Sequence, residues 1–207
     1  MNPLLSPSYD NKIFHKYSAR TLEGKVQNKL REQEELGWPR EPKIPLLILP
    51  SGMSEEMGGT LFEEVLPGIL SLSCQILVRG KGSQRYGEIF TTLEKEHPHR
   101  VHIVKDDPTV QRKLYAAADM GLFFAPMSRD DEETGNCLSY GVVPIAPPYD
   151  PLWNYDPVQE AGNSFTADPL NHWTWFAALA RACETFKLPF DWRTIQRSAM
   201  ETAKREE

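Results

Sequence analysis

Apolar runs of strand length alternate along this chain with longer segments of helical character. The runs span residues 44–49, 75–78, 101–104, 121–125, 142–146 and 164–166. The helical segments span residues 55–72, 85–96, 109–117, 132–140 and 173–186. Short apolar strands that alternate with helices favour a parallel sheet whose two faces are both covered. The sequence therefore predicts an α/β fold with a single Rossmann-like, doubly wound parallel sheet.

The flanking segments differ from this alternating region. Residues 1–42 are polar and proline-containing apart from one helix expected near 19–36, and we interpret them as a lead-in arm. Residues 43–187 form the expected Rossmann-like domain, and residues 188–207 a C-terminal helix with Asp191 as its expected N-cap. With 207 residues, of which 40% are hydrophobic, the chain is long enough to bury one sizeable core.

The charge and the cysteines argue against several classes of protein. The formal net charge is -6 with both signs interspersed, whereas nucleic-acid binding needs clustered Lys and Arg, so we expect no nucleic-acid partner. Cys74, Cys137 and Cys183 are far apart and odd in number. They are expected to be reduced core thiols of a cytoplasmic protein. No apolar run approaches the roughly 18 residues of a membrane span, so no membrane association is expected.

Three histidines, His97, His99 and His102, lie close together in the sequence. No cysteine or carboxylate cluster beside them completes the ligand set of a metal site. We therefore expect neither a metal nor another cofactor.

The segment PSGMSEEMGG, residues 50–59, lies between an expected strand and an expected helix. Sheets of this kind bind ligands beyond the carboxyl ends of their strands, and helix N-termini there hold phosphates. This turn, however, carries two glutamates and no Lys or Arg. A phosphate-binding position without cations needs an explanation.

Five stretches of the chain resemble, in order and spacing, the C-terminal domain of bacterial glycogen synthases and plant starch synthases. They are SPSYD...YSARTLEGKVQNKLREQEELGW, LVRGKGSQRYGEIF, RVHIVKDDPTVQRKLYAAAD, SYGVVPIA and AGNSFTADP. The resemblance covers almost the whole chain. It implies one half of a GT-B glycosyltransferase, in which two Rossmann-like domains face each other across a cleft and the C-terminal one binds ADP-glucose. The N-terminal domain of the family is expected to be missing here.

The family places an S-R-L pattern and then Q-K-G after this strand, and the Arg and Lys clamp the diphosphate. Counted without a gap, the serine falls on Ser51, the arginine on Gly52, the lysine on Met57 and the glycine on Gly58. The resemblance therefore implies that both cations have been lost.

Two further family positions are altered. The functional glutamate of the family falls on Ser128, because the surrounding segment has the same length; Glu132 or Glu133 would reach the cleft only with a shifted register. The glycine pair of a G-G-L loop falls on Asp150 and Pro151, and neither suits a phosphate. We therefore expect no catalytic residue in this chain.

The candidate ligand-binding residues are Gly58, Gly80, Gly82, Asp107 and Tyr115. Most of them also have a structural interpretation. Gly80 and Gly82 can form a tight turn, Asp107 can be the N-cap of the following helix, and Tyr115 can pack in the core. The aromatic segment 173–176 is expected to pack in the core rather than to stack on glucan rings.

Three hypotheses about function follow. The first is a glycogen or starch synthase-like glycosyltransferase domain that is inactive alone and acts as a binding or partner module, with weak ADP-glucose or other nucleotide binding. The second is half of a split ADP-glucose glucosyltransferase, completed by a separately encoded N-terminal domain. The third is a decaying fragment of a longer gene.

Overall fold

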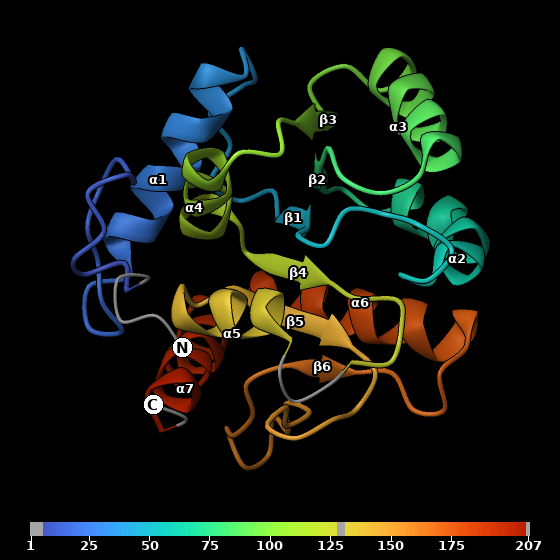
Figure 1. Cartoon of the computed structure of the whole chain (residues 1–207). Helices are drawn as coiled ribbons and strands as arrows, with labels where there is room; N and C mark the ends of the chain where they lie inside the picture. The colour runs from blue at the N-terminus through green and yellow to red at the C-terminus, as the bar shows by residue number, and fades with distance from the viewer. Residues whose placement is uncertain (1–5, 128–130, 206–207) are drawn as a thin grey trace.

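A computed structural model describes residues 6–127 and 131–205 of the chain. Within these residues, six parallel strands form one sheet in the order β3-β2-β1-β4-β5-β6 (Figure 1). The strands are β1 (Leu46–Leu49), β2 (Gln75–Arg79), β3 (Val101–Val104), β4 (Met120–Leu122), β5 (Val143–Ala146) and β6 (Phe165–Thr166). The predicted doubly wound α/β fold is confirmed, and its topological switch point lies between β1 and β4.

Helices cover both faces of the sheet (Figure 1). They are α1 (Glu23–Glu35), α2 (Gly59–Ser71), α3 (Gln84–Glu96), α4 (Pro108–Ala117), α5 (Glu132–Ser139), α6 (His172–Phe186) and α7 (Pro189–Arg205). Side chains of α2, α3 and α6 pack in one hydrophobic cluster with Leu47 and Leu49. Those of α4 and α5 pack in a second cluster with Leu46 and Ile48. Because β1 is buried on both faces, its sequence is uniformly apolar.

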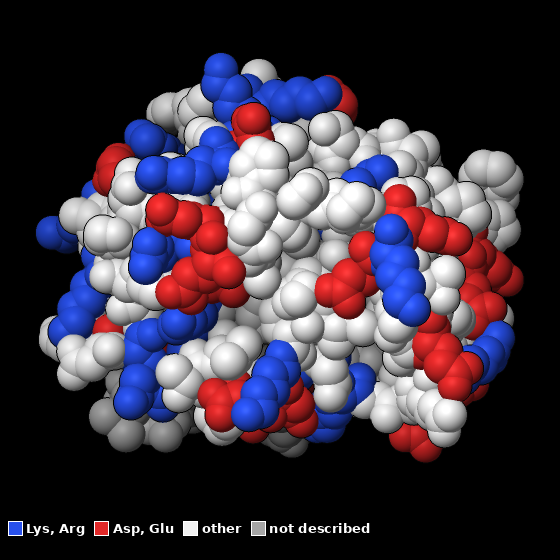
Figure 2. Space-filling view, turned by 90° about the horizontal axis from the view of Figure 1, so that it is seen from above, with Lys and Arg blue, Asp and Glu red and all other residues white. Residues whose placement is uncertain are grey.

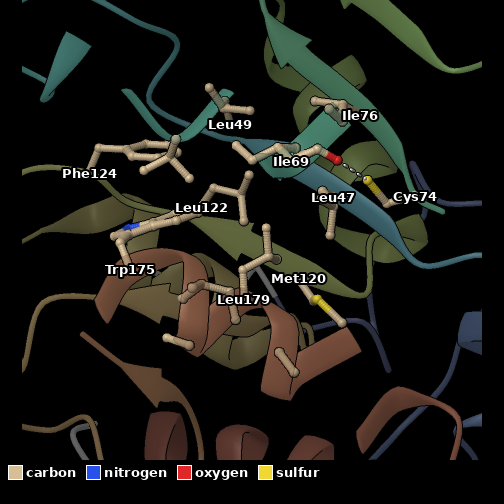
Figure 3. Packing of buried hydrophobic residues seen from close by; sticks show 14 of the residues in the cluster. Leu47, Leu49, Ile69, Cys74, Ile76, Met120, Leu122, Phe124, Trp175 and Leu179 are labelled. Atoms are coloured by element: carbon tan, nitrogen blue, oxygen red, sulfur yellow. Dashed lines mark hydrogen bonds between the residues drawn. The ribbon is translucent and has the colours of Figure 1, made fainter. Parts of the chain in front are cut away.

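The first cluster joins the sheet to α2 and α6 (Figure 3). Trp175 stacks on Phe124 with ring centroids 4.0 Å apart, and its Nε1 donates to the Phe123 carbonyl at 3.0 Å. Trp175 therefore packs in the core as expected for segment 173–176. The expectation is wrong for Trp173, whose side chain is 74% exposed, because it lies two positions before the buried Trp175 and therefore on a different face of α6.

Residues before β1 pack against the same domain. Ile13 and Tyr17 are buried in the second cluster, and the Tyr17 hydroxyl donates to the Tyr140 carbonyl at 2.8 Å. From α1, the Lys29 Nζ lies 2.6 Å from Asp119 Oδ2. The expected lead-in arm thus contributes to the core, while the boundaries at residues 42 and 187 stay a prediction.

Several element boundaries differ from those expected, among them the starts of α2 and α7 and the end of β4. Helix α2 begins at Gly59 rather than at residue 55, because residues 54–58 form a turn that ends at Gly58 with φ 83°. Strand β4 ends at Leu122, and Phe123 and Phe124 beyond it contact Trp175 of α6. Helix α7 begins at Pro189, so Asp191 is not its N-cap. The Asp191 carboxylate instead accepts a hydrogen bond from the Tyr155 hydroxyl at 2.6 Å.

The surface and the thiols agree with the sequence-based expectations. Figure 2 shows acidic and basic side chains side by side over the face that it displays. Cys74, Cys137 and Cys183 are buried and free. Among the helices that the structure describes, none is long and apolar enough to cross a membrane.

Candidate functional site

The carboxyl edge of the sheet is where a ligand would bind in this fold. Arg79, the last residue of β2, crosses this edge toward the switch point. Its guanidinium donates to Asp106 Oδ1 at 2.7 Å and to the Pro50 carbonyl at 3.1 Å. It also forms an ion pair with Glu133 on the first turn of α5. One cation therefore ties together the turns after β1 and β3 and the start of α5.

Glu133 is held from a second side. The Tyr115 hydroxyl donates a hydrogen bond to the Glu133 carboxylate. Tyr115 is buried, and this burial, with the nearby Cys137 and Glu133, raises the pKa of Tyr115 well above its ordinary value. The core interpretation of Tyr115 is thus confirmed. Its hydroxyl positions a carboxylate of the chain itself.

A second carboxylate of the chain itself, that of Glu55, lies just before the N-terminus of α2. The Glu55 side chain accepts hydrogen bonds from the Thr60 and Tyr86 hydroxyls, and Arg85 lies 3.5 Å from it. These hydrogen bonds, from Thr60 first and Tyr86 second, lower the pKa of Glu55. The N-terminal end of a helix favours an anion. In this chain Glu55 supplies that anion.

The turn after β1 is joined to the turn after β2 by backbone hydrogen bonds. The Met53 N–H donates to the Lys81 carbonyl at 3.1 Å, and the Ser83 N–H donates to the Met53 carbonyl at 3.1 Å. Gly82 has φ 126°, and a Cβ on it would lie 1.9 Å from the Met53 carbonyl oxygen. The contact requires glycine at position 82. These contacts support the tight-turn interpretation of Gly82.

The position that matches the family arginine has no room for a side chain. Gly52 has φ 71°, and a Cβ on it would lie 2.0 Å from the Lys81 carbonyl oxygen. The position that matches the lysine, Met57, is 40% exposed and open to change. Gly58 is the left-handed N-cap of α2, where a Cβ would lie 2.5 Å from the Phe124 carbonyl oxygen. The backbone of this turn therefore excludes a side chain at position 52, whereas position 57 has room for a longer one.

Two cavities border this edge. One of about 300 Å³ lies between the turn after β1 and the segment after β4, and its lining includes Glu56 and Asp131 but no Lys or Arg among the described residues. The other, of about 220 Å³, lies over the turn after β2 and is lined by Arg79, Gly80 and Lys81 among others. Ser128, the position of the family glutamate, lies outside the described residues. The cavity nearer the switch point is therefore acidic.

The remaining candidates have structural roles. The Asp107 carboxylate caps α4, because it accepts hydrogen bonds from the Thr109 and Val110 N–H groups at 2.9 and 3.2 Å. Gly80 lies against β3, where a Cβ would be 3.0 Å from the Val104 carbonyl oxygen. Whether any of the five candidate residues contacts a ligand stays a prediction.

Sequence reasoning missed the two residues that organise this edge. Arg79 directly follows the apolar run of β2, and a cation at the carboxyl end of a buried strand was an available signal. Glu133 had been considered only under a shifted register. Among the described residues, no group of three or more His, Cys, Asp or Glu side chains could hold a metal ion.

The sequence of this chain is similar to part of several known glycogen synthases. No family model matches the chain. It is 31% identical over 205 residues to the glycogen synthase of Thermosipho melanesiensis, covering 95% of this chain and 42% of that protein. The glycogen synthase of Clostridium perfringens is 29% identical with the same coverage. The chain thus spans about 42% of the length of these curated relatives.

A solved structure agrees with this likeness in fold. The catalytic domain of starch synthase IV from Arabidopsis thaliana, bound to ADP and acarbose, matches with a TM-score of 0.77 and 19% identity. The match covers 98% of this chain and 45% of that one. The chain therefore has the fold of one half of such a catalytic domain.

Proposed function

We propose that this chain, a glycogen synthase-like glycosyltransferase domain of GT-B type, is catalytically inactive alone and acts as a binding or partner module. The observation that carries the proposal is that two carboxylates of the chain itself lie at the carboxyl edge of the sheet. Glu55 takes the anion position at the N-terminus of α2, and Glu133 neutralises Arg79 beside the switch point. A nucleotide diphosphate would have to displace or face both.

Electrostatics favour weak binding and no turnover. A charge that develops on a leaving diphosphate needs preorganised cations, and losing one such donor costs roughly 3 kcal/mol of barrier. The matched positions hold Gly52 and Met57, and Glu56 lines the adjacent cavity. A carboxylate near a diphosphate repels it. Stabilisation of a bound diphosphate would therefore be weakened twice, by the absence of the two cations and by the presence of nearby carboxylates.

A nucleotide is nevertheless the ligand class to test first. Starch synthase IV was solved with ADP, and HepE of Anabaena, which matches with a TM-score of 0.63 and 12% identity, was solved with UDP and glucose. The fold that this chain shares with them supports residual nucleotide binding, with ADP-glucose as the first compound. Arg79 is the cation best placed to contact a phosphate if Glu133 moves away.

The alternative is half of a split ADP-glucose glucosyltransferase, completed by a separately encoded N-terminal domain. One observation favours it: the loop after β5 exposes two large apolar side chains, Trp153 at 60% and Val158 at 90%. Exposed apolar side chains of this size suit contact with a second domain. In this alternative the partner would supply the missing cations across the cleft.

The test is transfer of labelled glucose from ADP-glucose to glycogen by the purified chain. We expect no incorporation above a heat-killed control. Turnover by the chain alone would overturn the proposed inactivity. The experiment is repeated after coexpression with the product of a neighbouring gene, if that gene encodes an N-terminal synthase domain. Transfer that appears only in the coexpressed complex would favour the split enzyme.

A further inference from the structure

A cavity of about 450 Å³ lies at the opposite, amino edge of the sheet. It is enclosed by α1, by the segment that enters β1, and by the turn between α6 and α7. Its floor includes Asp119, the residue before β4, whose carboxylate accepts a hydrogen bond from the Leu46 N–H at 2.8 Å. The volume is typical of small-molecule sites, which span about 300 to 1,000 Å³. This amino-edge cavity is remote from the crevice described above.

Basic side chains outnumber acidic ones in the lining. Five cations border the cavity, against Asp119 as the one carboxylate among the described residues: Lys25, Lys29, Lys43, Lys187 and Arg193. The Asp119 charge is already compensated by Lys29 at 2.6 Å. The amino-edge cavity therefore carries net positive charge.

Two cations at the rim have only exposed acidic partners. Lys187 pairs with Glu184 at 2.6 Å, and Arg193 lies 3.4 Å from Glu23. Exposed pairs of this kind contribute little energy, about 0 to 1 kcal/mol, so an incoming anion can compete for these cations. Lys43 forms no ion pair with another residue in the described part of the chain and is the third cation at the opening.

Lys25, one of the five cations, is buried and has a lowered pKa. It is 2% exposed, and its Nζ donates to the Tyr115 and Ala116 carbonyls at 2.8 and 3.4 Å. The charged or titratable groups that face it are Lys29 on α1, Asp119, Cys137 on α5 and the Tyr17 ring at 5.6 Å. Burial lowers the pKa of Lys25 to about 7. An anion brought into this environment would favour the charged form of Lys25.

The rest of the lining is apolar. Leu22, the N-cap of α1, and Val26 within that helix line the cavity together with Phe186, Pro189 and Trp192. The Trp192 indole N–H is buried and has no hydrogen-bond partner among the described residues. An apolar wall with cations on one side suits a ligand that has an apolar body and an anionic head.

We propose that the amino-edge cavity binds a small organic anion with an apolar body, of which a medium-chain carboxylate is the simplest form. The apolar body would lie against Val26, Phe186 and Trp192, and the carboxylate would reach Lys43 and Lys187 at the rim. The inference does not depend on the proposed function, because it concerns the other end of the sheet.

Octanoate is the probe, and 1-octanol is the uncharged control of the same chain length. Calorimetric titration of the full chain is expected to give saturable one-to-one binding of octanoate, at least tenfold tighter than binding of 1-octanol. The double variant Lys43→Gln with Lys187→Gln should weaken octanoate binding about tenfold and leave 1-octanol unchanged. Lys81→Gln with Lys95→Gln, which removes two cations outside this cavity, is the matched control.

A second variant tests the apolar wall. Val26 is 41% exposed, so Val26→Asp should leave the fold intact while placing a carboxylate in the path of the ligand. We expect it to abolish octanoate binding, whereas Val158→Asp, at a position 90% exposed elsewhere, should not. Equal binding of octanoate and 1-octanol, absence of saturation in the wild type, or unchanged affinity in both cavity variants would overturn the proposal.

Discussion

The two ends of the sheet carry opposite charges. At the carboxyl edge, where folds of this kind bind nucleotides, Glu55 and Glu133 occupy the anion positions and Glu56 lines the cavity. At the amino edge, five cations surround a larger and partly apolar cavity. A phosphate-binding edge needs cations that are free to meet the ligand. At the carboxyl edge the chain's own carboxylates pair with Arg79, whereas at the amino edge Lys43 forms no ion pair with another described residue.

The ion pair at the floor of the amino edge should dominate stability. Lys29 and Asp119 are almost completely buried, so Lys29→Met would leave an unpaired buried carboxylate. We expect the free energy of unfolding in urea to fall by about 3 to 5 kcal/mol. Arg31→Met removes a cation from the exposed pair with Glu34 at 2.8 Å and should cost no more than about 0.5 kcal/mol. Equal losses in the two variants would contradict the contrast between buried and exposed pairs.

The turn geometry of the carboxyl edge gives the next largest effect. Gly52→Ala places a Cβ 2.0 Å from the Lys81 carbonyl oxygen in a left-handed conformation, and we expect destabilisation of about 2 to 3 kcal/mol. Gly87→Ala is the matched control, because a Cβ there meets nothing within 4 Å and the residue lies inside α3. That variant should gain about 0.5 to 1 kcal/mol by thermal denaturation. Tolerance of alanine at position 52 would mean that an arginine can also be restored there.

The buried lysine of the amino edge predicts a pH dependence. The pKa of Lys25 is about 7 in the folded chain and has its ordinary value of 10.5 when unfolded. Between these values the unfolded chain binds the proton and the folded chain does not, so the stability contribution of Lys25 rises with pH. The slope is at most about 1.4 kcal/mol per pH unit. Lys25→Met should lack this rise when the free energies of unfolding of both proteins are compared at pH 7.5 and 9.5. An equal change in the free energy of unfolding between the two pH values in both proteins would contradict the assignment of the rise to Lys25.

A single restored cation at the carboxyl edge should have the smallest effect. Met57 is 40% exposed and lines the acidic cavity, so Met57→Lys should tighten ADP-glucose binding a few-fold, about 1 kcal/mol or less. The gain should shrink when the salt concentration is raised from 50 to 300 mM, because exposed charges are screened. Val158→Lys is the matched control at another exposed position. Equal gains from both variants would assign the effect to net charge rather than to the site.

The sequence predicted the sheet well because the signal was local. Strands such as β1 and β5 are buried along their whole length and read as continuous apolar runs. The cap at Asp107 was also predictable, since an aspartate before a proline at the start of a helix is a short-range pattern. Elements whose signal lies within a few residues were therefore placed correctly, apart from shifts of a few residues at their ends.

The organisation of the site was not predictable in the same way. Arg79 and Glu133 are 54 positions apart in the sequence, and only the order of the strands brings them together. The conformation of Gly52 depends on the Lys81 carbonyl in a different turn. Sequence comparison matched the family arginine and lysine to Gly52 and Met57, and that match stays a prediction. It could not indicate that Glu133 pairs with Arg79 or that Glu55 accepts hydrogen bonds from Thr60 and Tyr86.

A calorimetric titration with ADP of the wild type and of Glu133→Gln tests this account most directly. The substitution removes one of the two carboxylates that pair with Arg79 and leaves Asp106 in place. Glu94→Gln, which removes the partner of His102, is the control. We predict no saturable binding by the wild type or the control below about 1 mM, and at least tenfold tighter binding by Glu133→Gln that weakens with salt. Low-micromolar binding of ADP by the wild type, or no gain in affinity in Glu133→Gln, would contradict the claim that Glu133 blocks phosphate binding at Arg79.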